Sequence, residues 1–152
     1  YLRQETKVWV EITTLLIPAY NDSAHEIGKM SEWLAKELGE DCPLHFTAFH
    51  PDYKMTAIPA TPSAKLTEAR QIAHSAGLLH VYTGNVHDLS GGTTLCANCH
   101  APLIVRDWYQ IRDYAVTESG KCLTCGTQLA GHFEKFTGQF GRKRVPIKIT
   151  GY

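Results

Sequence analysis

The sequence carries no net charge, because its 15 lysine and arginine residues are balanced by 15 aspartate and glutamate residues. Proteins that bind nucleic acid or anionic membranes through counterion release need a basic face, so this balance argues against both roles. The one basic cluster, Arg142-Lys143-Arg144, lies in a glycine-rich tail, and we interpret it as solvated. Long apolar runs are also missing. None reaches the roughly 20 residues that a transmembrane helix needs, and no signal-peptide pattern opens the sequence.

Several catalytic motifs are missing as well: we find no Ser/His/Asp arrangement, no glycine-rich phosphate loop and no HExxH pair. Cysteine is sparse, with five residues of which only Cys42 stands outside two close pairs. This pattern does not resemble a secreted disulfide framework, so we expect a reducing, cytoplasmic setting. The sequence starts at Tyr1, and residues 1–5 resemble the last turn of a helix. We therefore expect the chain to be part of a longer protein.

The two cysteine pairs are Cys96/Cys99 and Cys122/Cys125, each with the spacing C-x2-C. Two residues between the thiolates allow both to bind one ion, and four thiolates complete the tetrahedron that zinc prefers. The 22 residues between the pairs slightly exceed the usual spacing, but they contain two short β-prone runs on either side of Asp107-Trp108. A β-hairpin between two cysteine pairs predicts a zinc ribbon.

Other interpretations of these cysteines exist. Cys96 to His100 spells C-x2-C-H, the attachment motif of c-type haem, but this would leave Cys122 and Cys125 unexplained. Disulfides within C-x2-C pairs are redox-active, yet no thioredoxin-like pattern surrounds either pair. Packing in a hydrophobic core does not require two matched pairs. Zinc is the interpretation we favour.

The first 90 residues predict an α/β fold. The runs Val8–Ile17, Pro43–Phe49 and Leu78–Thr83 are typical of strands, and amphipathic segments separate them. Strands that alternate with helices predict right-handed crossovers and a parallel sheet, in a barrel or a doubly wound fold. The first run is nearly uninterrupted, so we expect it to be covered on both faces.

The helices between these strands have clear start and stop signals. Ser23 and Glu26 form a capping box, and Gly39 is a suitable stop. Thr61-Pro62 predicts a second N-cap followed by proline at the first helical position. We expect Trp9 and Trp33 to pack in the core or between a helix and the sheet, and Gly91-Gly92 to form a hinge into the ribbon.

Loops that follow parallel strands gather at one edge of the sheet, where active sites of such folds lie. The loop from His50 to Pro62 is long for a strand-to-helix connection, and His50 could bind a ligand or move a proton. A packed, hydrogen-bonded histidine fits the spacing equally well. Asp52 and its neighbours are more typical of a solvated turn. We expect structural roles for His25, His74 and His80, which fall within predicted helices or strands.

Three strand segments and the cysteine pairs together resemble one known family. The segments read WVEITTLLIPAYND, LHFTAFHPDYKM and HVYTGNV, and they precede the paired C-x2-C motif in the same order. From Lys7 to Gly131 the chain resembles the C-terminal part of the radical S-adenosylmethionine (SAM) enzymes of the AmmeMemoRadiSam system. These enzymes are relatives of the pyruvate formate-lyase activating enzymes.

The resemblance implies that the chain supplies the last βα units of a partial (β/α)6 barrel. Family enzymes hold a [4Fe–4S] cluster through a CxxxCxxC loop and reductively cleave SAM to a radical that abstracts hydrogen from a substrate. Neither the cysteine pairs nor Cys42 can supply CxxxCxxC, so we expect the chain alone to be inactive without the missing N-terminal half of the barrel. Memo-like and AMMECR-like proteins are the partners that the resemblance implies.

The resemblance also implies site residues. Leu16 and Ile17, at the end of the first strand, match the position that flanks the SAM adenine. Thr47 and His50 match a strand-end pair that contacts SAM, although the local sequence AFHP differs from that of the activating enzymes. The four paired cysteines match the family's C-terminal ribbon, with His100 at a position where glycine is more usual.

We therefore expect three segments: the barrel part (1–90), the zinc ribbon (91–131) and a C-terminal tail (132–152). In the alternative interpretation, the ribbon binds a protein or nucleic-acid partner and the chain has no catalysis of its own. Arg106, Trp108, Tyr109 and Arg112 would then form the binding surface, because they are basic or aromatic.

Overall fold

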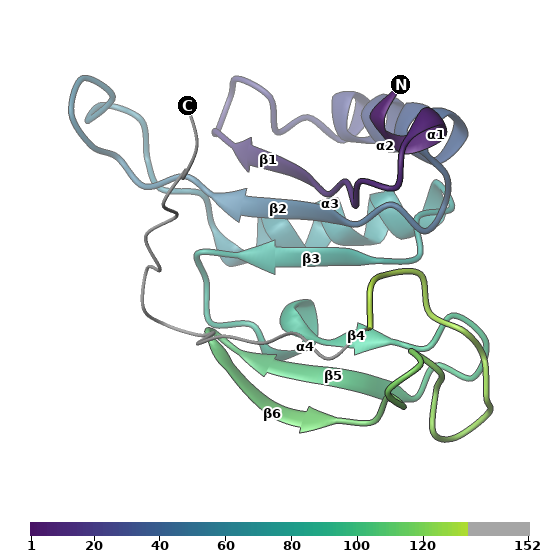
Figure 1. Ribbon diagram of the computed structural model, residues 1–152. Coiled ribbons are helices and arrows are strands. Elements are labelled where there is room, and N and C mark those ends of the chain that lie inside the picture. Colours follow the sequence, from purple (N-terminus) through teal and green to yellow (C-terminus); the bar gives the residue numbers. More distant parts are fainter. Residues whose placement is uncertain (134–152) are drawn as a thin grey trace, which may run out of the picture.

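The computed structural model describes residues 1–133, so most of the expected tail, including Arg142-Lys143-Arg144, lies outside the described residues. The elements follow one another along the chain as shown in Figure 1. In order they are α1 (Leu2–Glu5), β1 (Ile12–Leu16), α2 (Ala24–Leu38), β2 (Leu44–Ala48), α3 (Ser63–Ser75), β3 (Val81–Gly84), α4 (Leu89–Gly92), β4 (Thr94–Leu95), β5 (Pro102–Asp107) and β6 (Gln110–Tyr114).

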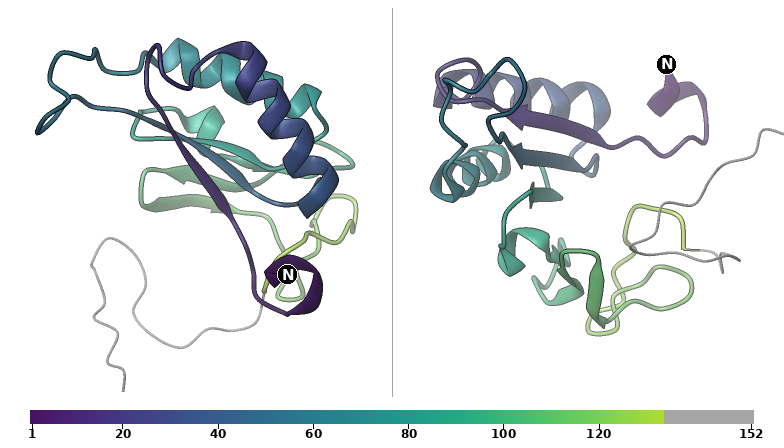
Figure 2. Two further views of the ribbon diagram at one scale, coloured as in Figure 1. Left: turned by 90° about the horizontal axis from the view of Figure 1, so that it is seen from above. Right: turned by 90° about the vertical axis from the view of Figure 1, so that its left-hand side faces the viewer.

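The first three strands form a parallel sheet in the order β1-β2-β3, as the alternation of strands and helices predicted. Both α2 and α3 lie on the same face of this sheet (Figure 2). The core between them contains eleven buried side chains: Leu16, Ile27, Leu34, Leu44, Phe46, Ala48, Leu66, Ala69, Ala73, Leu78 and Val81. The sequence is thus a mixed α/β chain, with an open sheet covered by two helices.

The helix ends follow the predicted signals with one exception. The Ser23 side chain caps α2 by accepting a hydrogen bond from the backbone of Glu26, and Gly39 ends the helix with a φ of 94°. Thr61 does not cap α3, which begins one residue later than predicted. Its hydroxyl instead donates to the Leu16 carbonyl and accepts from the Phe49 N–H, so it fastens the long loop to two strands.

The opposite face of the sheet is not covered by helices. Two predictions of burial were wrong, one for β1 and one for Trp33 of α2. Thr13 and Leu15 of β1 are exposed, so this strand is not covered on both faces. Ile12, Thr14 and Leu16 form the face that meets the helices, and Thr13 and Leu15 point the other way. Trp33 is 57% exposed, because it lies on the outer side of α2 rather than in the core.

The second sheet is antiparallel, in the order β4-β5-β6. Its hairpin turns at Trp108, which has a left-handed φ of 53°, close to the predicted turn. Gly91 and Gly92 belong to the short helix α4 and are not an open hinge. The backbone of Gly91 packs so closely against Thr83 that a Cβ atom there would clash with the Thr83 hydroxyl. This contact ties the two halves of the chain together.

A second, smaller core lies beneath the cysteine pairs. It contains the buried side chains of Cys96, Leu103, Val116, Cys122 and Leu129. Two of its five members are thiols, so apolar packing alone provides little burial in this part of the chain. Within residues 1–133, no helix is both long and apolar enough to span a bilayer.

Candidate metal centre and the cavity between the sheets

The two cysteine pairs come together at one point, as predicted. The Sγ atoms of Cys96 and Cys125 lie 3.6 Å apart, and those of Cys99 and Cys122 lie 3.8 Å apart. All four sulfur atoms are within 4.8 Å of one another. This four-cysteine group could hold a metal ion.

The backbone forms the same turn at each pair. The His100 N–H donates to the Cys96 carbonyl, and the Gly126 N–H donates to the Cys122 carbonyl, at 3.0 and 2.9 Å. Both residues that follow the pairs have a left-handed φ, 56° for His100 and 76° for Gly126. His100 therefore occupies the position that glycine occupies in the second turn, and the two turns are equivalent.

The geometry fits one tetrahedral ion. A zinc–sulfur distance of about 2.3 Å places the sulfur atoms of a regular tetrahedron roughly 3.8 Å apart, close to the shortest distances here. An iron–sulfur cluster would place several iron and sulfide atoms between the thiolates and needs a wider separation. Attachment of haem would convert Cys96 and Cys99 into thioethers, yet each lies against a cysteine of the other pair.

The thiols influence one another's ionisation. Hydrogen bonds from Thr127 lower the pKa of Cys125 to about 5. At Cys99 the backbone of Ala101 pulls the pKa down, but hydrogen bonds with the three other thiols raise it to about 12. A divalent cation would displace the thiol protons, so metal affinity should increase with pH.

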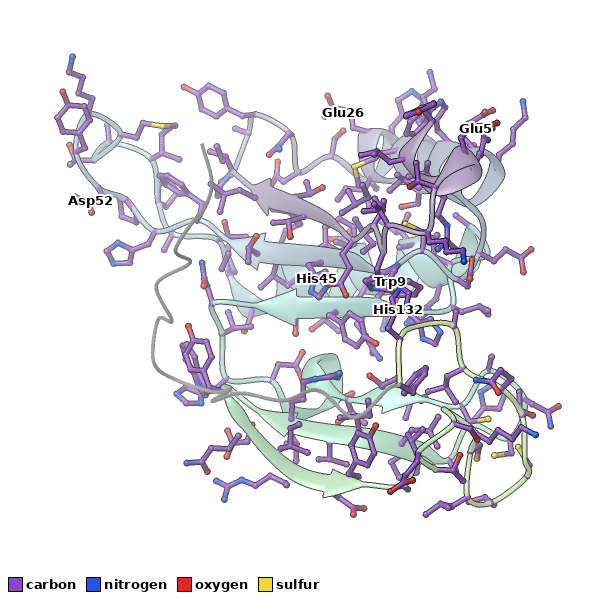
Figure 3. All side chains as sticks on the ribbon, in the orientation of Figure 1. Glu5, Trp9, Glu26, His45, Asp52 and His132 are labelled. Carbon is purple, nitrogen blue, oxygen red and sulfur yellow. The ribbon has the colours of Figure 1, made fainter. Side chains whose placement is uncertain are left out.

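A cavity of about 980 Å³ lies between the uncovered face of the first sheet and the second sheet. Residues from both sheets and from the segment before the undescribed tail line it, among them Glu11, His45, His80, Tyr82, Arg106 and His132. Figure 3 shows His45 beside Trp9 and His132, whereas Asp52 lies far away on its loop. The rings of Trp9 and His132 meet edge to face, with centroids 6.2 Å apart.

A chain of polar contacts crosses this cavity wall. The Glu11 carboxylate is 2.9 Å from His45 Nε2, and the His45 ring stacks on Tyr82 with centroids 5.0 Å apart. The Tyr82 hydroxyl lies 2.8 Å from the Thr94 hydroxyl, which also accepts a hydrogen bond from Arg106 at 2.7 Å. The network links the parallel sheet to the second sheet.

The residues that the resemblance implied for SAM lie elsewhere. The Leu16 side chain is fully buried in the core under the helices. The Ile17 N–H donates to Asn21, and the Thr47 hydroxyl donates to the Thr14 carbonyl. His50 is exposed after β2. None of these four residues lines the cavity, and the contacts of Leu16, Ile17, Thr47 and His50 with SAM stay predictions.

The residues around Ile12 and Phe46 carry a sequence signal for the polar wall of the cavity. Glu11 and Thr13 precede and follow Ile12, and His45 and Thr47 flank Phe46. This period of two predicts a strand face that is polar and uncovered. Arg106 could not be found in this way, because it reaches the first sheet only through the folding of the ribbon.

Comparison with known proteins identifies a relative in an archaeon. The chain is 40% identical over 129 residues to "Uncharacterized protein MJ0808" of Methanocaldococcus jannaschii. The match covers 84% of this chain but 39% of that protein, so the chain spans about two fifths of the length of its curated relative. No family model matches the chain, and no solved structure matches it.

Proposed function

We propose that this chain is the C-terminal part of a radical SAM enzyme of the AmmeMemoRadiSam system. In such an enzyme, reductive cleavage of SAM yields a radical that abstracts hydrogen from a substrate. Strands β1–β3 would be the last strands of a partial (β/α)6 barrel. One observation carries the proposal: helices cover only one face of the parallel sheet, and the polar opposite face lines a cavity, as the interior of an open barrel would.

The residues described here do not fit the iron–sulfur cluster of such an enzyme. Four cysteines converge at a single-ion site, and Cys42 is buried with its thiol directed at the Val10 carbonyl. The cluster ligands would have to come from another part of a longer protein. The relative from M. jannaschii, which extends well beyond the matched region, is consistent with such an arrangement.

The metal centre in this proposal is structural. Four thiolates complete the coordination of zinc and leave no open position for a substrate or an activated water. Binding of zinc would instead stabilise the ribbon, whose own apolar core is small. The ribbon would then hold β5 against the cavity.

A chimera tests the proposal. The matched region of the M. jannaschii protein is replaced by the corresponding residues of this chain, and the chimera is prepared without oxygen, supplied with iron and sulfide, reduced and mixed with SAM. We expect formation of 5′-deoxyadenosine by the chimera and none by this chain alone. A relative that binds no iron–sulfur cluster, or that leaves SAM intact, would refute the proposal.

The ribbon also offers a surface for the second function, that of a binding module. All five residues of β6 are exposed, including Ile111 and Tyr114, and Tyr109 in the turn is 68% exposed. Arg112 is the basic residue here, but it is paired with Asp107 at 2.7 Å. Salt-dependent binding of RNA or DNA by the isolated chain would favour this function, and so would capture of Memo-like or AMMECR-like proteins through β6.

A further inference from the structure

We propose that the cavity between the two sheets binds a small organic anion, with its carboxylate or phosphate at Arg106. The inference goes beyond the radical SAM assignment and does not depend on it, because none of the residues expected to contact SAM lines the cavity. It rests on three observations: an arginine that no acidic side chain of the lining pairs with, a buried histidine without a hydrogen-bond partner among the described residues, and an apolar wall.

The acidic side chains of the lining do not pair with Arg106. Three of them line the cavity, and each accepts hydrogen bonds from the protein itself: Glu11 from Trp9, Asp88 from Gly91, and Asp107 from Arg112. They do not neutralise the guanidinium of Arg106 through an ion pair.

The guanidinium of Arg106 has N–H groups that donate no hydrogen bond within residues 1–133. Its Nη1 donates to the Thr94 hydroxyl at 2.7 Å and to the Gly92 carbonyl at 3.3 Å, and both partners are neutral. Among residues 1–133, no acidic group lies within ion-pair distance of this guanidinium, and its other nitrogen atoms donate to none of them. The contact of its Cζ atom over the Tyr82 ring, at 5.6 Å, holds the group in place. A planar guanidinium with free N–H groups is suited to a carboxylate or phosphate.

His80, in the cavity lining, has a polar atom without a partner among the described residues. The residue is 8% exposed, and its Nδ1 atom is buried without a hydrogen-bond partner within the described part of the chain. Buried polar atoms are nearly always paired, so the partner of this atom lies outside residues 1–133. His80 lines the same cavity as Arg106.

The rest of the wall selects an organic ligand over a simple ion. The apolar side chains that line the cavity include Pro43, Val86, Leu89, Ile104 and Leu129. The volume of about 980 Å³ is at the upper end of the range for small-molecule sites. An anion with an aromatic or branched aliphatic body would use both the guanidinium and this apolar wall.

The probe for the test is 1-anilinonaphthalene-8-sulfonate, an aromatic anion whose fluorescence rises in an apolar site. Its uncharged counterpart, N-phenyl-1-naphthylamine, has the same body without the sulfonate. We expect the zinc-loaded chain to bind the anion, and Arg106→Gln to weaken that binding about tenfold or more while the uncharged probe binds as before. Competition by benzoate or by phenyl phosphate then identifies the preferred acidic group.

Lys29→Gln is the control, since Lys29 is an exposed cation on α2 and does not line the cavity. It should leave the binding of both probes unchanged. Equal binding of the anion by wild type and Arg106→Gln would overturn the proposal, as would equal losses in the two variants.

A second measurement needs no variant and covers the case in which Arg106→Gln fails to fold. In an NMR titration of the wild-type chain with benzoate and with phenyl phosphate, the proposal expects the largest amide shifts at Tyr82, Thr94 and Arg106. Shifts centred on the exposed strand β6, or no shifts with either compound, would also overturn it.

Discussion

The Sγ atoms of Cys96 and Cys125 lie 3.6 Å apart, although 29 positions separate the two residues in the sequence. Bringing them together closes a long loop, and the entropy of that closure has to be offset. The small core beneath the cysteines provides limited apolar burial. A metal ion that binds all four thiolates would supply the remaining stabilisation.

The equivalence of the two cysteine turns can be tested at Gly126. Its φ of 76° is left-handed, and a Cβ atom built there would meet no atom within 4 Å. Gly126→Ala should therefore destabilise the zinc-loaded chain by about 1 kcal/mol, through backbone strain alone. Urea unfolding measures the loss. His100→Gly, at the equivalent position, should have no such cost; a larger loss for His100→Gly than for Gly126→Ala would contradict the equivalence.

The core under the helices should tolerate truncation poorly. Phe46 is fully buried in the middle strand β2, so Phe46→Ala should cost about 3–5 kcal/mol of unfolding free energy. Trp33 is a control of similar type, because it is aromatic but largely exposed. Trp33→Ala should change stability by less than about 1 kcal/mol. Comparable losses from both substitutions, measured by denaturant unfolding, would mean that α2 packs differently.

The contact between Tyr82 and Thr94 should couple the two sheets. Tyr82→Phe and Thr94→Ala each remove one side of the hydrogen bond between the hydroxyl groups. In a double-mutant cycle of unfolding free energies, we expect a coupling of about 0.5–1.5 kcal/mol. Additive effects of the two substitutions would show that the sheets do not meet at this point.

His80 should make the chain less stable in mild acid. Burial lowers the pKa of His80 below its ordinary value, so the unfolded chain binds a proton more readily than the folded chain. Stability from this residue is complete above the unfolded pKa of about 6.5 and falls as the pH drops below it. Urea unfolding between pH 7.5 and 5 should show a smaller loss for His80→Asn than for wild type.

The exposed His25 provides the control for this experiment. His25→Asn should retain the wild-type pH dependence. Because the thiol groups titrate equally in all three proteins, the difference between variants isolates the imidazole. A His80→Asn profile parallel to that of wild type would contradict the assignment.

Local patterns in the sequence predicted much of this structure. The β-branched runs predicted all three parallel strands, Ser23 and Gly39 predicted the ends of α2, and the spacing of the cysteines predicted their convergence. Each of these signals comes from residues that are close together in the sequence. Backbone geometry and helix capping act directly over such short distances along the chain.

Features that depend on contacts between distant segments were not predicted. Trp33 was expected in the core because hydrophobicity alone does not say which side of a helix meets the sheet. Thr61 was expected to cap a helix, but its hydroxyl found two strand partners. The polar wall of the cavity requires Tyr82 and Arg106, which only the packing of the two sheets brings together.

The metal content of the purified chain tests the central claim most directly. Elemental analysis should find one zinc ion per chain, and the double variant Cys99→Ser/Cys125→Ser should lose it together with the amide protection of the ribbon. Removal of zinc with EDTA should have the same effect on the protection of residues 91–131. A wild-type chain without bound metal, or a ribbon whose protection is unchanged after zinc removal, would contradict the account.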